Sequence, residues 1–187
     1  QFLQQQLVPK EGEIVEIFKH SPLFAQETPE FSSKEDELEY LSRKIDYKKT
    51  DGKVIGKHQG AQFFTIGQSK GLGIGGHKES CFIVSRDMEN NIIFVGEGHS
   101  FPGLHKKALK IDNSELHWVR EDLRLKNGES MEVMARFRYR QALDKATIYQ
   151  FENAFYMEFE KPQSAIAEGQ FAAWYIDDEL IGSGVIS

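Results

Sequence analysis

The sequence predicts a mainly β protein, built from a small central β-rich domain and a C-terminal β-barrel, with one short inserted helix. Beyond residue 50, short apolar or alternating runs follow one another at a spacing of roughly 8–12 residues. Turn-forming residues separate many of these runs. No long helical pattern lies between them, and this rhythm is typical of barrels and small sandwiches.

The first 16 residues predict a short lead-in that ends in a strand. Ile14, Val15 and Ile17 give this stretch the apolar content and alternation of a β-strand. The residues that follow have a different character, so the strand is expected to stop there.

Residues 19–50 predict a polar insert with one surface helix. They contain two prolines and few aliphatic side chains, and the run SSKEDELEYLSRK at 32–44 has helical character. Ser32 as the N-cap and Glu35 three positions later form a capping box. Acidic residues then lie in the first turn and basic residues near the end, as the helix dipole favours. We expect a solvated helix that the fold does not need.

The remaining elements are expected to be strands. They cover residues 62–67, 80–86, 91–98, 131–140, 146–151, 154–159, 171–176 and 179–186. Turns are expected at Asp51-Gly52, Asn90-Asn91, Lys126-Asn127-Gly128 and Asp177-Asp178. A boundary near Trp118 divides the chain into a domain over 1–117, with the insert at about 19–50, and a barrel over 118–187.

Composition and charge exclude several classes of protein. The chain has 187 residues and a net charge of -6. It contains one Cys, and this single thiol excludes an internal disulfide and a Cys-rich zinc site. No stretch approaches the ~20 apolar residues of a membrane span, no signal peptide is visible, and the scarcity of Cys fits the cytoplasm. Residues 1–50, 51–145 and 146–187 carry -3, +3 and -6. The basic middle fits an RNA-facing surface and chance equally well.

The glycine-rich stretch VIGKHQGAQFFTIGQSKGLGIGG at residues 54–76 is the most distinctive part of the sequence. It is not a phosphate-binding loop, because it lacks GK[ST] and GxGxxG spacing and precedes a strand instead of a helix. Two interpretations stay open. The stretch is either a plain connection between two strands or a loop that contacts the backbone of a partner, with Lys70 as its charge.

The run MEVMARFRYR predicts an arginine-lined strand over residues 131–140. Alternation places Arg136, Arg138 and Arg140 on one face at intervals of about 6–7 Å, and Tyr139 on the other. Guanidinium groups in a row beside an aromatic ring suit a nucleic-acid backbone with a stacked base. The alternative is a solvated strand face that pairs with nearby carboxylates.

Other catalytic and metal-binding chemistry is not expected. The six His show no HxH or HxxxH spacing, so no metal site is predicted. No GxSxG motif exists, which argues against a serine hydrolase. Cys81 lies in an expected strand, and we interpret it as a buried, inert thiol.

These stretches together resemble the tRNA-specific 2-thiouridylases, the MnmA/TrmU family. HQGAQFFTIGQSKGLGIGG at residues 58–76 is similar to the family signature H-x-G-x-x-F/Y-T-I-G-Q-R-K-G-L-G-I-G-G, with Ser69 in place of Arg. Further matches follow in family order at residues 84–96, 136–141 and 161–186. The resemblance covers residues 1–16 and 51–187, and the insert at about 19–50 is not typical of the family.

The resemblance implies that this chain is the non-catalytic part of a tRNA-uridine 2-sulfurtransferase. In the family, an N-terminal ATP-pyrophosphatase domain with an SGGxDS loop adenylates the wobble uridine, and a cysteine-borne sulfur displaces AMP. This chain contains no SGGxDS, and Cys81 occupies the wrong place for the family's second catalytic Cys. We therefore expect no catalytic residue and no cofactor here. ATP, a sulfur donor and a sulfur-relay protein belong to the intact enzyme, and the chain alone is expected to be inactive.

The resemblance also implies where tRNA binds. The family's contacts match Arg138, Tyr139 and Gln170, while Lys70, Arg136 and Arg140 are candidates for further contacts. Glu168 replaces the family's Pro before Gly169-Gln170. The alternative function is a stand-alone, non-enzymatic β-barrel module that binds RNA or protein.

Overall fold

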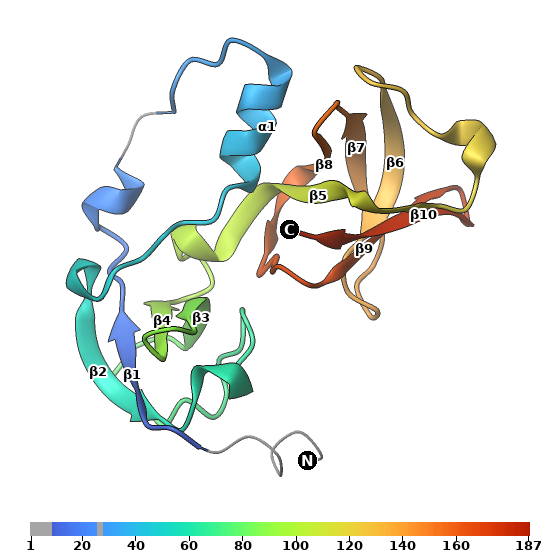
Figure 1. The fold of residues 1–187 in the computed structure, drawn as a ribbon. Coiled ribbons are helices and arrows are strands. Elements are labelled where there is room, and N and C mark those ends of the chain that lie inside the picture. Colours follow the sequence, from blue (N-terminus) through green and yellow to red (C-terminus); the bar gives the residue numbers. More distant parts are fainter. Residues whose placement is uncertain (1–8, 26–27) are drawn as a thin grey trace. The chain divides into compact units, whose positions relative to one another are not determined.

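A computed structural model describes residues 9–25 and 28–187. The first eight residues of the lead-in, and residues 26–27 of the expected insert, lie outside the described residues. The chain is mainly β, as predicted, and forms two compact units. The first comprises the described residues up to Thr28 and Ile45–His105, and the second comprises Pro29–Lys44 and Lys106–Ser187 (Figure 1).

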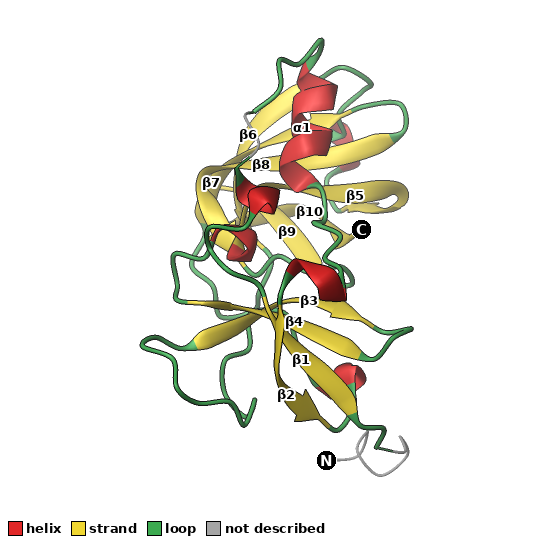
Figure 2. Cartoon of the chain, turned by 90° about the vertical axis from the view of Figure 1, so that its left-hand side faces the viewer, coloured by secondary structure: helices red, strands yellow, loops and turns green. Residues whose placement is uncertain are grey.

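The first unit is built on a four-stranded sheet. Its strands are β1 (Gly12–Glu16), β2 (Lys53–His58), β3 (Cys81–Asp87) and β4 (Ile92–Glu97), in the spatial order β2-β1-β4-β3 (Figure 2). β1 runs antiparallel to β2 and parallel to β4, and β3 and β4 form an antiparallel hairpin. Short 3-10 turns lie at Pro22–Phe24, Lys49–Asp51, Ala61–Phe63 and Pro102–Leu104.

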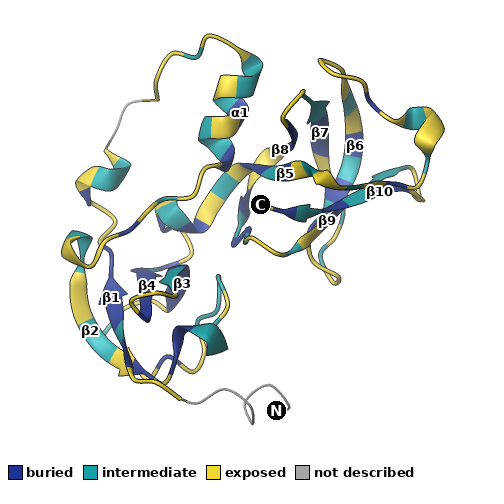
Figure 3. Ribbon diagram, viewed as in Figure 1, coloured by how far each residue is buried: buried dark blue, intermediate teal, exposed yellow. Residues whose placement is uncertain are grey.

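The glycine-rich segment, residues 59–80, covers one face of this sheet. Leu72 and Ala61 of the segment are buried with Ile14, Ile83 and Val95 of the strands. β1 and β4 are therefore dark blue in Figure 3, whereas β2 at the edge is largely exposed. The segment joins β2 to β3, as both interpretations require, and contact of Lys70 with a partner stays a prediction.

One expected strand within this segment is wrong. Residues 62–67 form a 3-10 turn and a loop, because the left-handed backbone at Gly60 and Gly67 interrupts an extended run. Only two backbone hydrogen bonds tie the loop to β3, from Gly67 N–H to Ile83 O (2.7 Å) and from Ile83 N–H to Gln68 O (2.9 Å). The apolar side chains of this run pack on one face of the sheet, and its backbone does not add a strand to the sheet.

The second unit contains the predicted barrel, closed by six strands. The strands are β5 (His105–Trp118), β6 (Ser130–Arg136), β7 (Asp144–Gln150), β8 (Ala154–Ser164), β9 (Phe171–Ile176) and β10 (Glu179–Ile186), in the order β10-β5-β8-β7-β6-β9. A 3-10 turn at Glu121–Leu123 leads toward β6. Closure leaves no free edge in this sheet.

Aromatic side chains fill the barrel. Trp174 is fully buried, stacks on Phe155 with ring centroids 4.9 Å apart, and meets Trp118 edge-on at 5.5 Å. Gly182 leaves room for this ring, since a Cβ at that position would lie 2.5 Å from Trp174. The Trp174 ring therefore occupies the space that a side chain at position 182 of β10 would need.

The expected boundary near Trp118 requires correction. Residues 105–118 form one 14-residue strand, and its end pairs with β10 from Trp118 onto Gly182. The units therefore divide between His105 and Lys106, and β5 belongs to the barrel. The sequence did not predict β5 because its exposed positions carry polar residues such as Asp112, Ser114 and Glu115.

The predicted helix exists, but it belongs to the barrel unit. α1 (Lys34–Ser42) is capped by Ser33, whose Oγ accepts from Asp36 N–H at 3.1 Å, and not by Ser32 as predicted. Leu38 is fully buried and clusters with Ala108, Ala154 and Tyr156 of the barrel. This packing contradicts the expectation of a solvated, dispensable insert. None of the described helices has the length and apolar character needed to cross a membrane.

Candidate functional site

The arginine strand is shorter than predicted. β6 ends at Arg136, and residues 137–140 form a bend and a turn, so the three arginines do not share one strand face. Phe137 keeps the inward alternation of Val133 and Ala135, since its ring is buried in the barrel beside Phe159 with centroids 5.9 Å apart, but the backbone leaves the strand at this point. Arg138 and Arg140 consequently lie in an exposed loop, on opposite sides of Tyr139 in the sequence.

Arg138 joins this loop to a second loop of the barrel. Its Nη2 donates to the backbone oxygens of Ser164 (2.8 Å) and Ala165 (2.9 Å). Gln141 adds a parallel connection, since its Nε2 donates to Gln163 Oε1 at 2.9 Å. The loop over residues 137–143 and the loop over residues 164–170 therefore form one surface, called here the paired loops.

Gln170 closes the second of the paired loops. Its N–H donates to Ala167 O (3.3 Å), and its Oε1 accepts from Ala167 N–H (3.0 Å). Gly169 has a φ of 80°, which is the backbone of a type II turn with Glu168 at the position where Pro is common. Glu168 therefore occupies the second position of this turn, and its Oε1 lies 3.6 Å from Lys44 Nζ.

Large, exposed side chains lie on the paired loops and directly after them, at the start of β9. Tyr139 is 90% exposed, and Phe171, directly after Gln170, is 69% exposed. Arg140 is exposed and forms no ion pair with any described residue. Exposed aromatic rings beside a free guanidinium offer stacking and phosphate contacts together. Phe171 was not among the predicted contacts, although its aromatic character beside Gln170 was a usable signal.

The other two predicted contacts differ from these. Arg136 donates from Nη2 to Tyr175 Oη at 3.0 Å, and its guanidinium lies 5.2 Å from the centre of the same ring. Lys70 lies in the glycine-rich segment of the first unit, and its side chain is exposed. The structure therefore brings Arg138, Tyr139 and Gln170 to the paired loops, whereas Lys70 belongs to a separate unit.

The glycine-rich segment has an open, irregular backbone. Residues 69 and 71–81 line a cavity of about 390 Å³, and Cβ atoms at Gly73, Gly75 and Gly76 would meet nothing within 4 Å. His58 anchors the start of the segment, because its Nδ1 accepts from Gly60 N–H at 2.9 Å. Burial lowers the pKa of His58, which keeps the imidazole neutral and able to accept this bond.

Three potential metal ligands meet at the other end of this segment. Glu16, His77 and Cys81 have ligand atoms that all lie within 4.8 Å of one another. Burial, with smaller contributions from the Glu16 and Glu97 carboxylates, raises the pKa of the Cys81 thiol to about 11. Local spacing could not reveal this group, because its carboxylate comes from a strand far back in the sequence.

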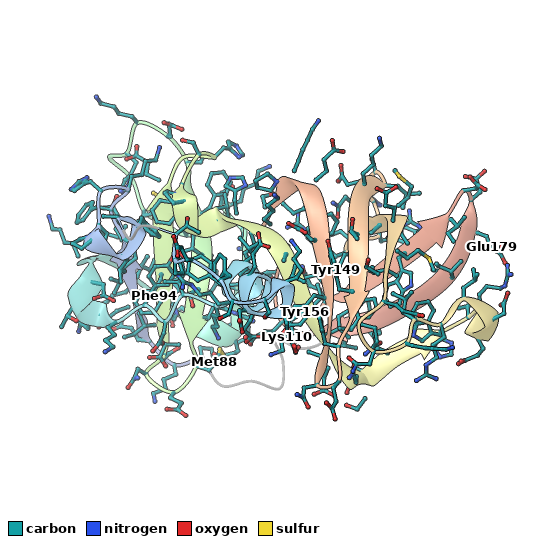
Figure 4. The ribbon with its side chains drawn as sticks, turned by 90° about the horizontal axis from the view of Figure 1, so that it is seen from above. Met88, Phe94, Lys110, Tyr149, Tyr156 and Glu179 are labelled. Atoms are coloured by element: carbon teal, nitrogen blue, oxygen red, sulfur yellow. The ribbon has the colours of Figure 1, made fainter. Side chains whose placement is uncertain are left out.

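A polar network holds α1 against the barrel on the side that carries Tyr149, Tyr156 and Lys110 (Figure 4). Glu39 accepts from Lys110 Nζ at 2.7 Å and from the Tyr156 hydroxyl. Glu158 of β8 pairs with Lys34 Nζ at 2.9 Å. Burial favours a raised pKa for Glu158, but its contacts with Lys34 outweigh burial and lower that pKa overall.

Comparisons with known proteins match two stretches of the chain, and the first begins within α1. A family model described as the tRNA methyl transferase PRC-barrel domain matches residues 36–97, and one described as the aminomethyltransferase beta-barrel domain matches residues 108–186. Among curated relatives, the tRNA-specific 2-thiouridylase MnmA of Flavobacterium johnsoniae is 56% identical over 187 residues, which are 100% of this chain and 47% of that protein.

Two further relatives carry the same name. The protein of Christiangramia forsetii is 50% identical over 186 residues, covering 100% of this chain and 47% of its own length, and that of Karelsulcia muelleri is 45% identical over 186 residues, with 100% and 46% covered. The chain spans about half the length of these relatives. These three relatives align across residues 19–50 as well, so they share this segment, and whether it is atypical of the wider family stays a prediction.

Proposed function

Since this chain belongs to the tRNA-specific 2-thiouridylase family, we propose that it is the tRNA-binding part of a tRNA-uridine 2-sulfurtransferase. The observation that carries the proposal is the paired loops. They present Tyr139 to solvent, lie directly before the exposed Phe171 of β9, and are joined by Arg138. The names of the relatives support tRNA as the substrate of the whole protein.

The residues of the paired loops have different tasks in this proposal. Arg140 has a free guanidinium and is the best placed of the three arginines to contact a phosphate. Arg138 donates two hydrogen bonds to the carbonyl groups of residues 164 and 165, so its main task is to position the loop over residues 164–170. Tyr139 supplies a ring on which a base stacks.

We further propose that the chemical step belongs to the part of the protein that lies outside this chain. That part would bind ATP, receive sulfur from a donor through a relay protein and supply the reactive cysteines. The chain alone is expected not to convert ATP to AMP in the presence of tRNA. Turnover of ATP by the purified chain would contradict this.

The test is fluorescence anisotropy of labelled tRNA with the 187-residue chain at several salt concentrations. Tyr139→Ala should weaken binding by about 1–3 kcal/mol, and Tyr139→Phe should bind nearly as well as the wild type if the ring stacks on a base. Arg140→Ala should reduce the slope of log K against log salt by about one unit. Arg124→Ala is the control, because Arg124 is an exposed arginine outside the paired loops that already pairs with Glu121.

Arg138→Ala should weaken binding more than Arg140→Ala, because it releases a loop as well as a charge. Amide exchange of residues 164–170 should accelerate in this variant and not in Arg140→Ala. The proposal is wrong if the wild-type chain does not bind tRNA at low salt. It is equally wrong if all three loop variants bind like the wild type while retaining the fold.

A further inference from the structure

Glu16, His77 and Cys81 bring a carboxylate, an imidazole and a thiol to one point of the first unit. Glu16 ends β1 and Cys81 begins β3, the two strands on either side of β4. His77 comes from the end of the glycine-rich segment, and its Nε2 lies 3.2 Å from Glu16 Oε1. Two sheet strands and the loop that covers them therefore converge here.

The buried groups at this point are poorly compensated. Cys81 is 6% exposed and Glu16 is 9% exposed. The carboxylate has the His77 ring as its polar partner, and the thiol makes no hydrogen bond with any of the described residues. Because burying a carboxylate is costly without strong partners, a cation would stabilise this arrangement.

The donor set selects the kind of cation. Thiolate, imidazole and carboxylate are the ligands of zinc, whereas calcium and magnesium prefer oxygen ligands alone. Three protein ligands leave a fourth tetrahedral position. His77 and Cys81 both line the 390 Å³ cavity of the glycine-rich segment, so an ion and a fourth ligand such as water can enter from that side.

A neighbouring carboxylate holds the turn that carries His77. Glu97 Oε1 accepts from the backbone N–H groups of Lys78 (2.8 Å) and Glu79 (2.9 Å). Gly98 N–H donates to Ser80 O at 2.9 Å and closes the same turn. These contacts fix the backbone of the turn that follows His77.

We propose that Glu16, His77 and Cys81 form a binding site for a zinc-class divalent ion that fastens the end of the glycine-rich segment to the sheet. This site lies in the first unit, so it is independent of the proposed tRNA contacts of the barrel. Binding displaces the thiol proton to solvent, and the bonds formed are from the metal to sulfur, nitrogen and oxygen.

The experiment titrates Co²⁺ into the reduced chain and follows the thiolate-to-cobalt absorption in the near ultraviolet. We expect the absorption to saturate at one equivalent and to disappear when Zn²⁺ displaces the cobalt. Cys81→Ser should abolish it, and Glu16→Gln and His77→Gln should weaken cobalt affinity at least about 100-fold, which exceeds the usual loss from outer-contact variants. His117→Gln, an exposed His on the barrel, is the matched control and should bind like the wild type.

A second measurement, the Tm with and without Zn²⁺, distinguishes loss of metal binding from loss of the fold. Zn²⁺ should raise the Tm of the wild type and of His117→Gln but not that of Cys81→Ser, which differs by a single atom. The proposal is overturned if the folded wild type shows no thiolate-to-cobalt absorption. It is also overturned if Cys81→Ser is stabilised by Zn²⁺ as strongly as the wild type.

Discussion

The barrel and the four-stranded sheet bury their apolar faces in different ways. The barrel closes on itself, so side chains of its own strands, above all Trp174, fill its interior. The sheet has two edges and is covered by the glycine-rich segment, of which Leu72 and Ala61 are buried. The stability of the closed barrel therefore comes from packing between regular strands. The stability of the open sheet depends partly on an irregular loop, and loops unfold locally at a lower free-energy cost than paired strands do.

The largest test of this comparison is Trp174→Ala. The variant should lose about 3–5 kcal/mol of unfolding free energy. Removal of the fully buried ring leaves a cavity, and the strands of a closed barrel cannot move inward to fill it. Denaturant unfolding followed by circular dichroism measures this loss. Phe171→Ala, on the same strand but exposed, should change stability by less than about 0.5 kcal/mol. Equal effects of the two variants would contradict a barrel-filling role for Trp174.

Leu38→Ala tests whether α1 belongs to the barrel. Removing this buried side chain should cost about 2–4 kcal/mol, since it packs on Ala108, Ala154 and Tyr156. Thermal unfolding provides the measurement, with the partly exposed Leu180→Ala as control. A change in Tm no larger than that of the control would restore the picture of a dispensable insert.

Leu72→Ala should affect the covered sheet alone. We expect a loss of about 2 kcal/mol, at the lower end for a buried leucine, because the loop can relax into the space. Hydrogen exchange should accelerate at Gly67 and Ile83, whose backbones pair across the loop and β3. Amides of β7 and β8 should keep their protection, and a uniform acceleration would remove the distinction between the two units.

The smallest expected effect concerns pH and the contact between α1 and the barrel. Because the pKa of Glu158 is lowered in the folded chain, its contribution is present above the usual value of 4.5 and is lost as the pH falls through the folded pKa. Acidification should therefore weaken α1 docking by about 1 kcal/mol or less. Glu158→Gln should flatten the acid side of the Tm profile. An unchanged profile would show that Lys34 and Glu158 contribute nothing.

The sequence predicted the barrel well because its strands bury alternating positions. Val133 and Ala135 of β6 are buried, and Phe171–Ile176 was predicted with its correct bounds. β5 was not predicted, because its exposed polar residues interrupt the alternation of apolar and polar side chains that marks a strand. The arginine strand was extended too far, since alternation continues through Phe137 although the backbone bends there.

The candidate sites were only partly predictable. Arg138 and Tyr139 were predicted from the arginine strand and Gln170 from the resemblance, but the hydrogen bonds from Arg138 to residues 164 and 165 depend on the closure of the barrel. The position of Leu38 against Ala154 is likewise a long-range contact that no local pattern encodes. Glu16 and Cys81 meet because two strands flank β4, which is a property of strand order and not of spacing.

The docking of α1 has a consequence for synthesis on the ribosome. The helix is made between two strands of the first unit, yet Glu39 and its partner Tyr156 are 117 positions apart. Leu38 therefore emerges long before the surface that buries it exists, and the barrel closes only when β10 pairs with β5. The order of translation cannot be the order of folding here. Until β5 and β8 have been synthesised, Leu38 has no barrel surface to pack on, so the nascent chain carries this apolar side chain exposed.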